Sequence, residues 1–406
     1  MRGDNHAGDN RGDNNPNNDI SFLVAGSRRL GCGVCDRRRL WRQQMGCMDR
    51  LDRCGLLKLS AIDVLCKHGT GEKQTDNEHA TAKLIHGKPP PEFGYCTPHP
   101  RPFKDGRHPL PLGEGWNFMN VLVLGGTRFV GKRLVHLLAE QGHDITVASR
   151  GKTIVSFPNN VQRLKLDRAS GDSMATALQN RHWDIVYDQI CFYTDDAASA
   201  AEILAGKTGR YVLCSSAAVY TNPLDAEEAA YDPTAYPIRS VGRSTISYAE
   251  GKRQAEAVIF QSPSLPAVAV RFPIILGADD YTKRLRIQVQ RIAANEPVNI
   301  ENPDAEISLI SSVEAAAFLA WLSGVPHTGP FNACSDGAVS LKEVVRFMEE
   351  ATGKTAIVKR QPEPDNFSIF GKPVSATLNT GKAKRAGFHF QQTRDWLQPL
   401  IRNAVS

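Results

Sequence analysis

From residue 119 onward, short apolar segments alternate with stretches in which apolar residues recur at helical spacing. Residues 121–124 (Val-Leu-Val-Leu) form the first apolar segment, and the helical stretch after it runs to Gly142. Further apolar segments and helical stretches follow in the same order. A short apolar strand followed by an amphipathic helix is the repeating unit of a parallel sheet that is covered by helices on both faces. The pattern therefore predicts an α/β fold with a Rossmann-type, doubly wound parallel sheet over residues 119–277.

The first 118 residues lack both patterns. They open on a low-complexity Asn/Asp/Gly tract with two Arg-Gly-Asp triplets, and proline clusters interrupt the end of the segment. Such sequence cannot bury enough apolar surface to offset the entropy lost on ordering. We expect residues 1–118 to be a disordered or spurious N-terminal extension without a role in chemistry. The alternative is a zinc site built from Cys32, Cys35, Cys47, Cys54 and His68, although the second cysteine pair lacks the usual zinc-ligand spacing.

Composition and charge narrow the class of protein. The chain has 406 residues, of which 41% are hydrophobic and 23% charged, so it can form at least one substantial core. No run reaches the roughly 18 consecutive apolar residues of a membrane span, so we expect no membrane partner. The net charge of +6 divides into +4 over residues 1–118 and +2 over residues 119–406, and this nearly neutral balance disfavours nucleic acid. Only three of nine cysteines follow residue 118, without framework spacing, which favours a cytoplasmic location.

A glycine-rich turn follows the first apolar segment. Gly125 permits a sharp turn, and Gly131 lets the following helix pack closely on the strand. The start of that helix offers backbone N–H groups and a partial positive charge to a pyrophosphate. The sequence therefore predicts a dinucleotide site with cofactor contacts from Gly125, Thr127, Arg128, Phe129, Val130 and Gly131.

Residues at the ends of the next two strands indicate whether the cofactor is NAD or NADP. The second strand ends in Ser149 and Arg150, a hydroxyl and a guanidinium that suit the 2′-phosphate of NADP. An acidic residue there would instead bind the ribose of NAD. The third strand ends in Asp167 and Arg168, where a carboxylate can accept a hydrogen bond from adenine. NADP is the expected cofactor, and NAD is the alternative. Arg150 could also be an ordinary solvent-facing arginine, and it would then have no effect on the choice of cofactor.

A serine, a tyrosine and a lysine that are suited to hydride-transfer chemistry follow the glycine-rich turn along the chain. Ser216 ends an apolar strand, and Tyr248 and Lys252 lie one turn apart on one face of a predicted helix. A neighbouring ammonium would lower the pKa of a phenol, so Tyr248 could exchange a proton with a substrate oxygen. Ser216 would hold that oxygen, and Lys252 would also bind the nicotinamide ribose. Alternatively, Ser216 is an ordinary hydroxyl at a strand end, and Tyr248 and Lys252 belong to an ordinary helix surface.

Residues 119 to about 400 resemble the extended and atypical short-chain dehydrogenase/reductases, the NAD-dependent epimerase/dehydratase family. The matching segments are GGTRFVG, LDR, SSAAVY, YAEGKRQAE and RFPIILG. The resemblance implies a catalytic triad of Ser216, Tyr248 and Lys252, with Pro273 and Ile274 bordering the nicotinamide. It also implies a smaller substrate-binding lobe over residues 278–406, interleaved with the nucleotide-binding domain. The family's usual middle glycine is Arg128 here, which could either clash with the pyrophosphate or neutralise it.

Two classes of function are consistent with these residues. The first is an NAD(P)-dependent enzyme without a metal, either a reductase of a small carbonyl compound or an epimerase/dehydratase of a nucleotide sugar. Its substrate contacts are expected from residues 222–243 and 281–284, and a homodimer is compatible with the fold. The second is a non-catalytic binding protein that keeps the dinucleotide fold, either an RNA-binding or a redox-sensing relative. The complete triad favours the enzyme, because a protein that only binds does not need all three side chains.

Overall fold

The computed structural model describes residues 118–239, 246–361, 368, 370–371 and 373–405. The expectations for residues 1–117, including the zinc ligands, lie outside the described residues. The same holds for residues 240–243 of the expected substrate loop.

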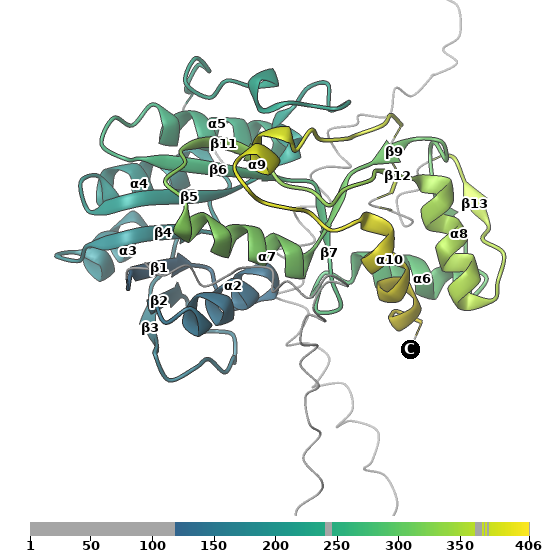
Figure 1. The fold of residues 1–406 in the computed structure, drawn as a ribbon, viewed down its shortest axis with the longest axis horizontal. Helices are drawn as coiled ribbons and strands as arrows, with labels where there is room; N and C mark the ends of the chain where they lie inside the picture. The colour runs from purple at the N-terminus through teal and green to yellow at the C-terminus, as the bar shows by residue number, and fades with distance from the viewer. Residues whose placement is uncertain (1–117, 240–245, 362–367, 369, 372, 406) are drawn as a thin grey trace, which may run out of the picture.

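The main sheet has seven parallel strands within the described residues, in the order β11-β6-β5-β4-β1-β2-β3 (Figure 1). The chain runs outward from β1 to β3 and then crosses to β4 on the other side of β1. The doubly wound α/β fold predicted from the sequence is confirmed, and its switch point lies between β1 and β4. Ligands bind at the carboxyl ends of strands at such a point. The strands are β1 (Asn120–Leu124), β2 (Asp144–Ser149), β3 (Val161–Lys165), β4 (Trp183–Asp188), β5 (Thr208–Ser216), β6 (Ala267–Phe272) and β11 (Gly329–Asn332).

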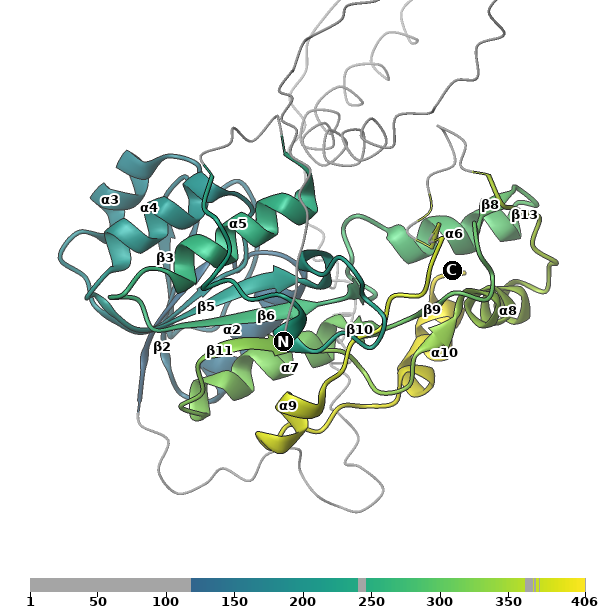
Figure 2. The same cartoon turned by 90° about the horizontal axis from the view of Figure 1, so that it is seen from above.

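Helices cover both faces of this sheet (Figure 2). α2 (Phe129–Glu140) and α7 (Ser312–Trp321) pack on one face, and α3 (Gly171–Leu178), α4 (Thr194–Leu204) and α5 (Tyr248–Phe260) pack on the other. The four apolar residues of β1 alternate between the two resulting cores and are all fully buried. This is the reason for an uninterrupted apolar run, since a central parallel strand has no solvent-facing side.

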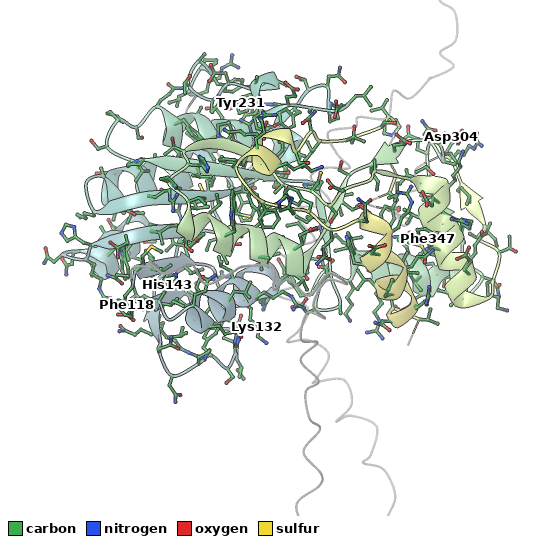
Figure 3. All side chains as sticks on the ribbon, viewed as in Figure 1. Phe118, Lys132, His143, Tyr231, Asp304 and Phe347 are labelled. Carbon is green, nitrogen blue, oxygen red and sulfur yellow. The ribbon has the colours of Figure 1, made fainter. Side chains whose placement is uncertain are left out.

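The C-terminal lobe has a core of its own, on the right of Figure 1. Leu285, Val289 and Ile292 of α6 are buried in it, together with Phe347 of α8, which Figure 3 labels. α7 and β11 return from this lobe to the main sheet, so the two parts are interleaved along the chain. The remaining elements are β7 (Ile274–Leu276), α6 (Arg284–Ala293), β8 (Val298–Asn299), β9 (Glu306–Ile307), β10 (Leu309–Ser311), β12 (Val339–Ser340), α8 (Leu341–Thr352), β13 (Val358–Lys359), α9 (Gly381–Arg385) and α10 (Thr393–Asn403), with the short 3-10 helices η1 (Ala217–Val219), η2 (Glu228–Ala230) and η3 (Leu322–Gly324).

Two elements end close to the positions that the sequence pattern predicts. α2 stops at Glu140, and Gly142 follows with a φ of +86° that favours glycine. β5 ends at Ser216, and the Ser216 hydroxyl then caps η1. None of the described helices is long and apolar enough to cross a membrane.

Candidate active site

The turn between β1 and α2 is built around two glycines. Gly125 has a φ of +91°, and a Cβ there would approach Cγ2 of Ile190 to 2.8 Å. A Cβ at Gly131 would lie 3.1 Å from the carbonyl oxygen of Gly125. The amide of Gly125 donates to the carbonyl of Ala148 at the end of β2, 3.0 Å away. The first turn of α2 is therefore held directly against the carboxyl ends of the central strands.

The start of α2 differs from the starts of α3, α5, α7 and α8. Arg128 is its N-cap residue, and no side-chain hydrogen bond caps the helix there. By contrast, a serine side chain caps α3, α5, α7 and α8. Arg128 is exposed, and its guanidinium carbon lies 5.3 Å from the ring centroid of Tyr281. An uncapped helix start, closely packed glycines and a nearby cation fit the pyrophosphate of a dinucleotide.

Residues predicted to choose the cofactor gather beside this turn. The carbonyl of Ser149 accepts a hydrogen bond from the amide of Leu166, 2.9 Å away, so the ends of β2 and β3 lie side by side. The Ser149 hydroxyl accepts from the amide of Gly151 at 3.3 Å. Arg150 and Asp167 are exposed at the same edge. The structure thus brings Ser149, Arg150 and Asp167 together, one strand away from Gly125.

Arg168 does not present its side chain to this edge. Its guanidinium is buried and bonds Oδ2 of Asp188 through two nitrogens, at 2.8 and 3.0 Å. It also donates to the carbonyl of Asp196 at 2.7 Å. Although burial acts to lower the pKa of Arg168, the charge of Asp188 raises it above its ordinary value. The Arg168 side chain therefore stabilises the fold. If Arg168 contacts the cofactor, as predicted, it does so through its backbone.

The carboxyl end of β5 and the start of α5 carry the predicted triad. The ammonium nitrogen of Lys252 is buried and lies 5.9 Å from the ring centroid of Tyr248. It donates to the carbonyls of Cys191 and Cys214, each at 2.8 Å. Cys214 stands two residues before Ser216, so Lys252 ties α5 to the strand that ends in the serine. The structure therefore brings Tyr248 and Lys252 together and fixes their helix to the end of β5.

Phe192 is a neighbour of this pair that the sequence analysis missed. The Lys252 ammonium lies 4.5 Å from the centroid of its ring, and the rings of Phe192 and Tyr248 are 6.4 Å apart. A Cβ at Gly251 would come within 2.6 Å of the Phe192 carbonyl oxygen, so only glycine allows this approach. Gly251, in the first turn of α5, was the available signal that another backbone passes close to Lys252.

A buried ionic network supports the end of β5 from behind. Ser215, adjacent to Ser216, donates its hydroxyl to Glu256 of α5. Glu256 pairs with Arg271 of β6 at 2.7 Å, and both side chains are fully buried. Arg271 also donates to the hydroxyl of Tyr220 at 3.0 Å, and burial raises the pKa of Tyr220 to about 12. The network fixes β5, β6 and α5 relative to one another, which sets the place of Ser216.

Pro273 and Ile274 follow directly on β6. Both are partly buried; Pro273 connects β6 to β7, and Ile274 is the first residue of β7. The chain then passes the start of α2, since a Cβ at Gly277 would lie 3.0 Å from Cε2 of Phe129. The two residues predicted to border the nicotinamide lie at the carboxyl end of β6, and their contact with a nicotinamide stays a prediction. Among the described residues, no group of three His, Cys, Asp or Glu side chains is placed to hold a metal ion.

Comparisons with known proteins agree with this geometry. The model of the "NAD dependent epimerase/dehydratase family" matches residues 121–311. The chain is 29% identical to the chloroplast stem-loop binding protein of 41 kDa b of Arabidopsis thaliana, over 61% of this chain and 67% of that protein. It is 29% identical to the 2′-dehydrokanamycin reductase of Streptomyces kanamyceticus, over 40% of this chain but only 45% of the reductase.

Solved structures share the fold at low sequence identity. A UDP-glucose 4-epimerase of Thermus thermophilus, solved in complex with NAD, has a TM-score of 0.54 and is 20% identical. The similarity covers 70% of this chain and 97% of the epimerase. A putative epimerase from Burkholderia cenocepacia has a TM-score of 0.55 and is 21% identical, over 72% and 98% of the two chains. The matching segment, the fold and the glycine turn agree with one another, and residues 121–311 are similar to the NAD-dependent epimerase/dehydratase family.

Proposed function

We propose that the chain is an NAD(P)-dependent enzyme that moves a hydride between its cofactor and a carbonyl or hydroxyl carbon of a small substrate. The observation that carries the proposal is the buried Lys252 ammonium beside Tyr248, on a helix tied to the strand that ends in Ser216. A buried cation that stands beside a phenol at the ligand-binding edge of a Rossmann-type sheet is suited to acid–base chemistry.

Each side chain has a separate task in this proposal. Tyr248 gives its phenolic proton to, or takes one from, the substrate oxygen, and Lys252 stabilises the phenolate that forms. Ser216 donates a hydrogen bond to the same oxygen and holds it in place. Pro273 and Ile274 exclude water from one side of the reacting groups. A bound nicotinamide supplies the hydride exchange.

We propose NADP as the preferred cofactor, on the basis of Ser149 and Arg150. A guanidinium and a hydroxyl at the end of β2 bind a 2′-phosphate, and no acidic side chain stands at either position to repel it. Several structural relatives were solved with NAD, which supports a nicotinamide dinucleotide in general. The preference is measured by titrating the protein with NADH and NADPH, with Arg150→Ala as the variant that should lose it.

The proposed substrate class is based on related proteins and not on a particular residue of this chain. Solved relatives are described with UDP, UDP-glucose or UDP-glucuronic acid, which supports a nucleotide sugar. The resemblance to a 2′-dehydrokanamycin reductase supports the reduction of a carbonyl compound instead. An epimerase or dehydratase uses its bound cofactor again, so net consumption of NADPH separates the reductase from both.

The test is made on the full-length chain. The purified protein is analysed for a co-purifying dinucleotide and is then assayed against panels of nucleotide sugars and carbonyl compounds. We expect turnover that Tyr248→Phe abolishes. Tyr236→Phe, which removes a phenol that bonds Glu250 instead, should leave turnover intact. Equal rates in the Tyr248→Phe variant and the original protein would refute the catalytic role.

A binding function without turnover is the second candidate, because the 41 kDa relative is described as a stem-loop binding protein. Residues 119–406 have a net charge of only +2, which gives little attraction to a phosphate backbone. Tight, salt-sensitive binding of a stem-loop RNA, together with inactivity on both panels, would favour this candidate over the enzyme.

A further inference from the structure

Gln189 is the first residue after β4, and its side chain packs against the turn between β1 and α2. Its backbone amide donates to the carbonyl of Leu124 at 3.0 Å, which holds the residue beside the end of β1. A Cβ added to Gly125 would lie 3.4 Å from Cβ of Gln189, and one added to Gly131 would lie 3.4 Å from its Cγ. The side chain therefore lies against both glycines of the turn that fits a pyrophosphate.

The amide nitrogen at the end of this side chain has no hydrogen-bond partner. Gln189 is partly buried as a residue, but its Nε2 atom is enclosed and makes no hydrogen bond to any described residue. An enclosed donor that stays unbonded destabilises a fold, and native structures seldom keep one without a reason. Rotation about the last side-chain bond of a glutamine is soft, so the nitrogen can turn toward the open edge of the sheet.

The neighbouring carboxylate does not supply the missing acceptor. Oδ1 of Asp188 accepts from the amide of Ile190 at 3.0 Å. Oδ2 accepts from the guanidinium of Arg168 at 2.8 Å and from the hydroxyl of Tyr211 at 2.7 Å. Successive side chains along a strand point to opposite faces of the sheet, and Gln189 lies on the face that α2 covers. Asp188 therefore points away from Gln189 and is satisfied by its own partners.

Ser312, the first residue of α7, provides a comparison at the same turn. Its hydroxyl also makes no hydrogen bond within the part of the chain that the structure describes. A Cβ added to Gly277 would overlap this hydroxyl and would lie 3.0 Å from Cε2 of Phe129. Ser312 is only 1% exposed, so a bound ligand does not reach it. Gln189 differs because part of its side chain is open to solvent.

We propose that Gln189 is a further cofactor-binding residue, whose side-chain amide donates a hydrogen bond to the pyrophosphate of the bound dinucleotide. The proposal rests on the dinucleotide site of the proposed function. The pyrophosphate is the expected partner because Gln189 contacts Gly125 and Gly131, the two glycines of the turn that fits this group. A hydrogen bond to a charged oxygen is stronger than one to a neutral group, so it offsets the unfavourable unbonded state of the amide.

The experiment measures binding and needs no substrate. Full-length protein is titrated with NADPH and NADH, and the fluorescence of the bound nicotinamide is followed. Calorimetry then measures binding of ADP-ribose, or of its 2′-phosphate form if NADPH is preferred, because this probe has the pyrophosphate but no nicotinamide. We expect Gln189→Leu to raise the dissociation constant about tenfold for both the dinucleotide and the probe. Gln189→Glu should weaken binding further, because it places a carboxylate of the same size beside the phosphates.

The melting temperature without cofactor distinguishes a binding role from a structural one. Gln189→Leu removes a donor that has no partner, so the melting temperature should stay the same or rise. A fall of more than a few degrees would mean that the amide supports the fold, and the proposal would be wrong. Ser312→Ala, which removes the enclosed unbonded hydroxyl, is the matched control and should change the dissociation constants less than twofold.

The outcomes separate this proposal from the proposed function. Unchanged affinity in Gln189→Leu would overturn the role of the amide, whereas the dinucleotide site would stand. Weaker binding of the dinucleotide with unchanged binding of the probe would also overturn it, because the contact would then lie at the nicotinamide half. An equal loss in Ser312→Ala would point to disturbed packing of the turn and would count against the proposal. If neither dinucleotide binds the original protein, the proposed function fails, and this proposal fails with it.

Discussion

The helices α2 and α5 both begin beside the candidate active site, but their first turns are completed in opposite ways. The Ser247 hydroxyl accepts the amide of Glu250 at 3.2 Å and caps α5, with an acidic residue in the first turn. α2 starts at Arg128, which provides no side-chain cap, and its first turn has no acidic residue. α5 satisfies its own backbone, so Tyr248 and Lys252 keep their positions without a ligand. No side chain caps the first amide groups of α2, which in our proposal bind the cofactor.

The difference has an energetic cost that packing must offset. A serine N-cap contributes about 1 kcal/mol, and a cation at a helix start costs roughly 0.3–1 kcal/mol. α2 lacks the stabilising cap, and the charge of Arg128 at its start is unfavourable. It is held instead by side chains such as Leu134, Val135 and Leu138, which are fully buried against the sheet. The comparison suggests that a helix without an N-terminal cap, held in place by its buried side chains, is a feature to look for in a binding site.

The largest expected effect concerns the α5 side of the comparison. Lys252→Met removes the cation 5.9 Å from the Tyr248 ring, so turnover should fall about 100-fold to 10,000-fold. The exposed Lys354, which follows α8, provides the control Lys354→Met, which should leave turnover unchanged. Steady-state rates on the substrate found in the panels measure both. A Lys252→Met enzyme within threefold of the original would contradict the role of the cation.

The second expected effect concerns a carboxyl group at the start of a third helix, α7. Glu314 stands in its first turn, but burial raises the pKa of this carboxyl from 4.5 to about 7, against weaker lowering by hydrogen bonds from Ser335 and Gln391. Glu250 of α5 differs. Although partial burial acts to raise its pKa, hydrogen bonds from Gln254, Tyr236 and Arg253 outweigh burial and lower it.

Stability should therefore depend on pH through Glu314. Between about pH 4.5 and 7 the folded chain keeps a proton that the unfolded chain has released, so the free energy of unfolding falls as pH rises. The slope from this group approaches about 1.4 kcal/mol per pH unit and vanishes above pH 7. Urea unfolding at pH 5, 6, 7 and 8 measures it, and Glu314→Gln should flatten the curve. An unchanged slope in the variant would show that other groups are responsible.

The third effect exchanges the two helix starts directly. Arg128→Ser gives α2 the cap that α5 already has, so the protein without cofactor should gain about 0.5–1 kcal/mol. The same change removes the counter-charge of the pyrophosphate, and the dissociation constant for the dinucleotide should rise about tenfold. Thermal melting and cofactor titration of one preparation provide both numbers. A gain in stability without a loss of affinity would remove Arg128 from the site.

The smallest effect is the reverse change on α5. Ser247→Ala removes a cap at a residue from which we expect no cofactor contact, so it should cost about 1 kcal/mol and leave the dinucleotide affinity unchanged. For a domain of this size the melting temperature should fall by roughly 2–4 °C. Calorimetry measures the shift. No shift at all would mean that packing alone determines the start of α5, and the comparison with α2 would lose its energetic basis.

The sequence predicted the fold because its signals are local. The four buried residues of β1, the glycine turn after it and the one-turn spacing of Tyr248 and Lys252 are all read within a few neighbouring positions. Each follows from the period of a strand or a helix, or from the backbone freedom of glycine. The order of the seven strands then follows from the rules for doubly wound sheets.

What the sequence could not predict depends on residues far apart in the chain. Arg168 resembled a strand-end cation until the fold placed Asp188 against it. Tyr281 meets Arg128 although more than 150 positions separate them, and no motif joins the two. Phe192 belongs to no recognised pattern, and only the glycine at position 251 indicates its close approach. Contacts of this kind are set by tertiary packing, which periodicity does not encode.

The most direct test of the central claim is a single turnover in which absorbance at 340 nm reports the bound nicotinamide. Full-length protein that carries one equivalent of dinucleotide is mixed rapidly with a substrate from the panels, for the original chain and for Tyr248→Phe. The account predicts a rapid change in absorbance for the original chain and a change at least 100-fold slower for Tyr248→Phe. The same rate in both proteins would show that another group moves the proton.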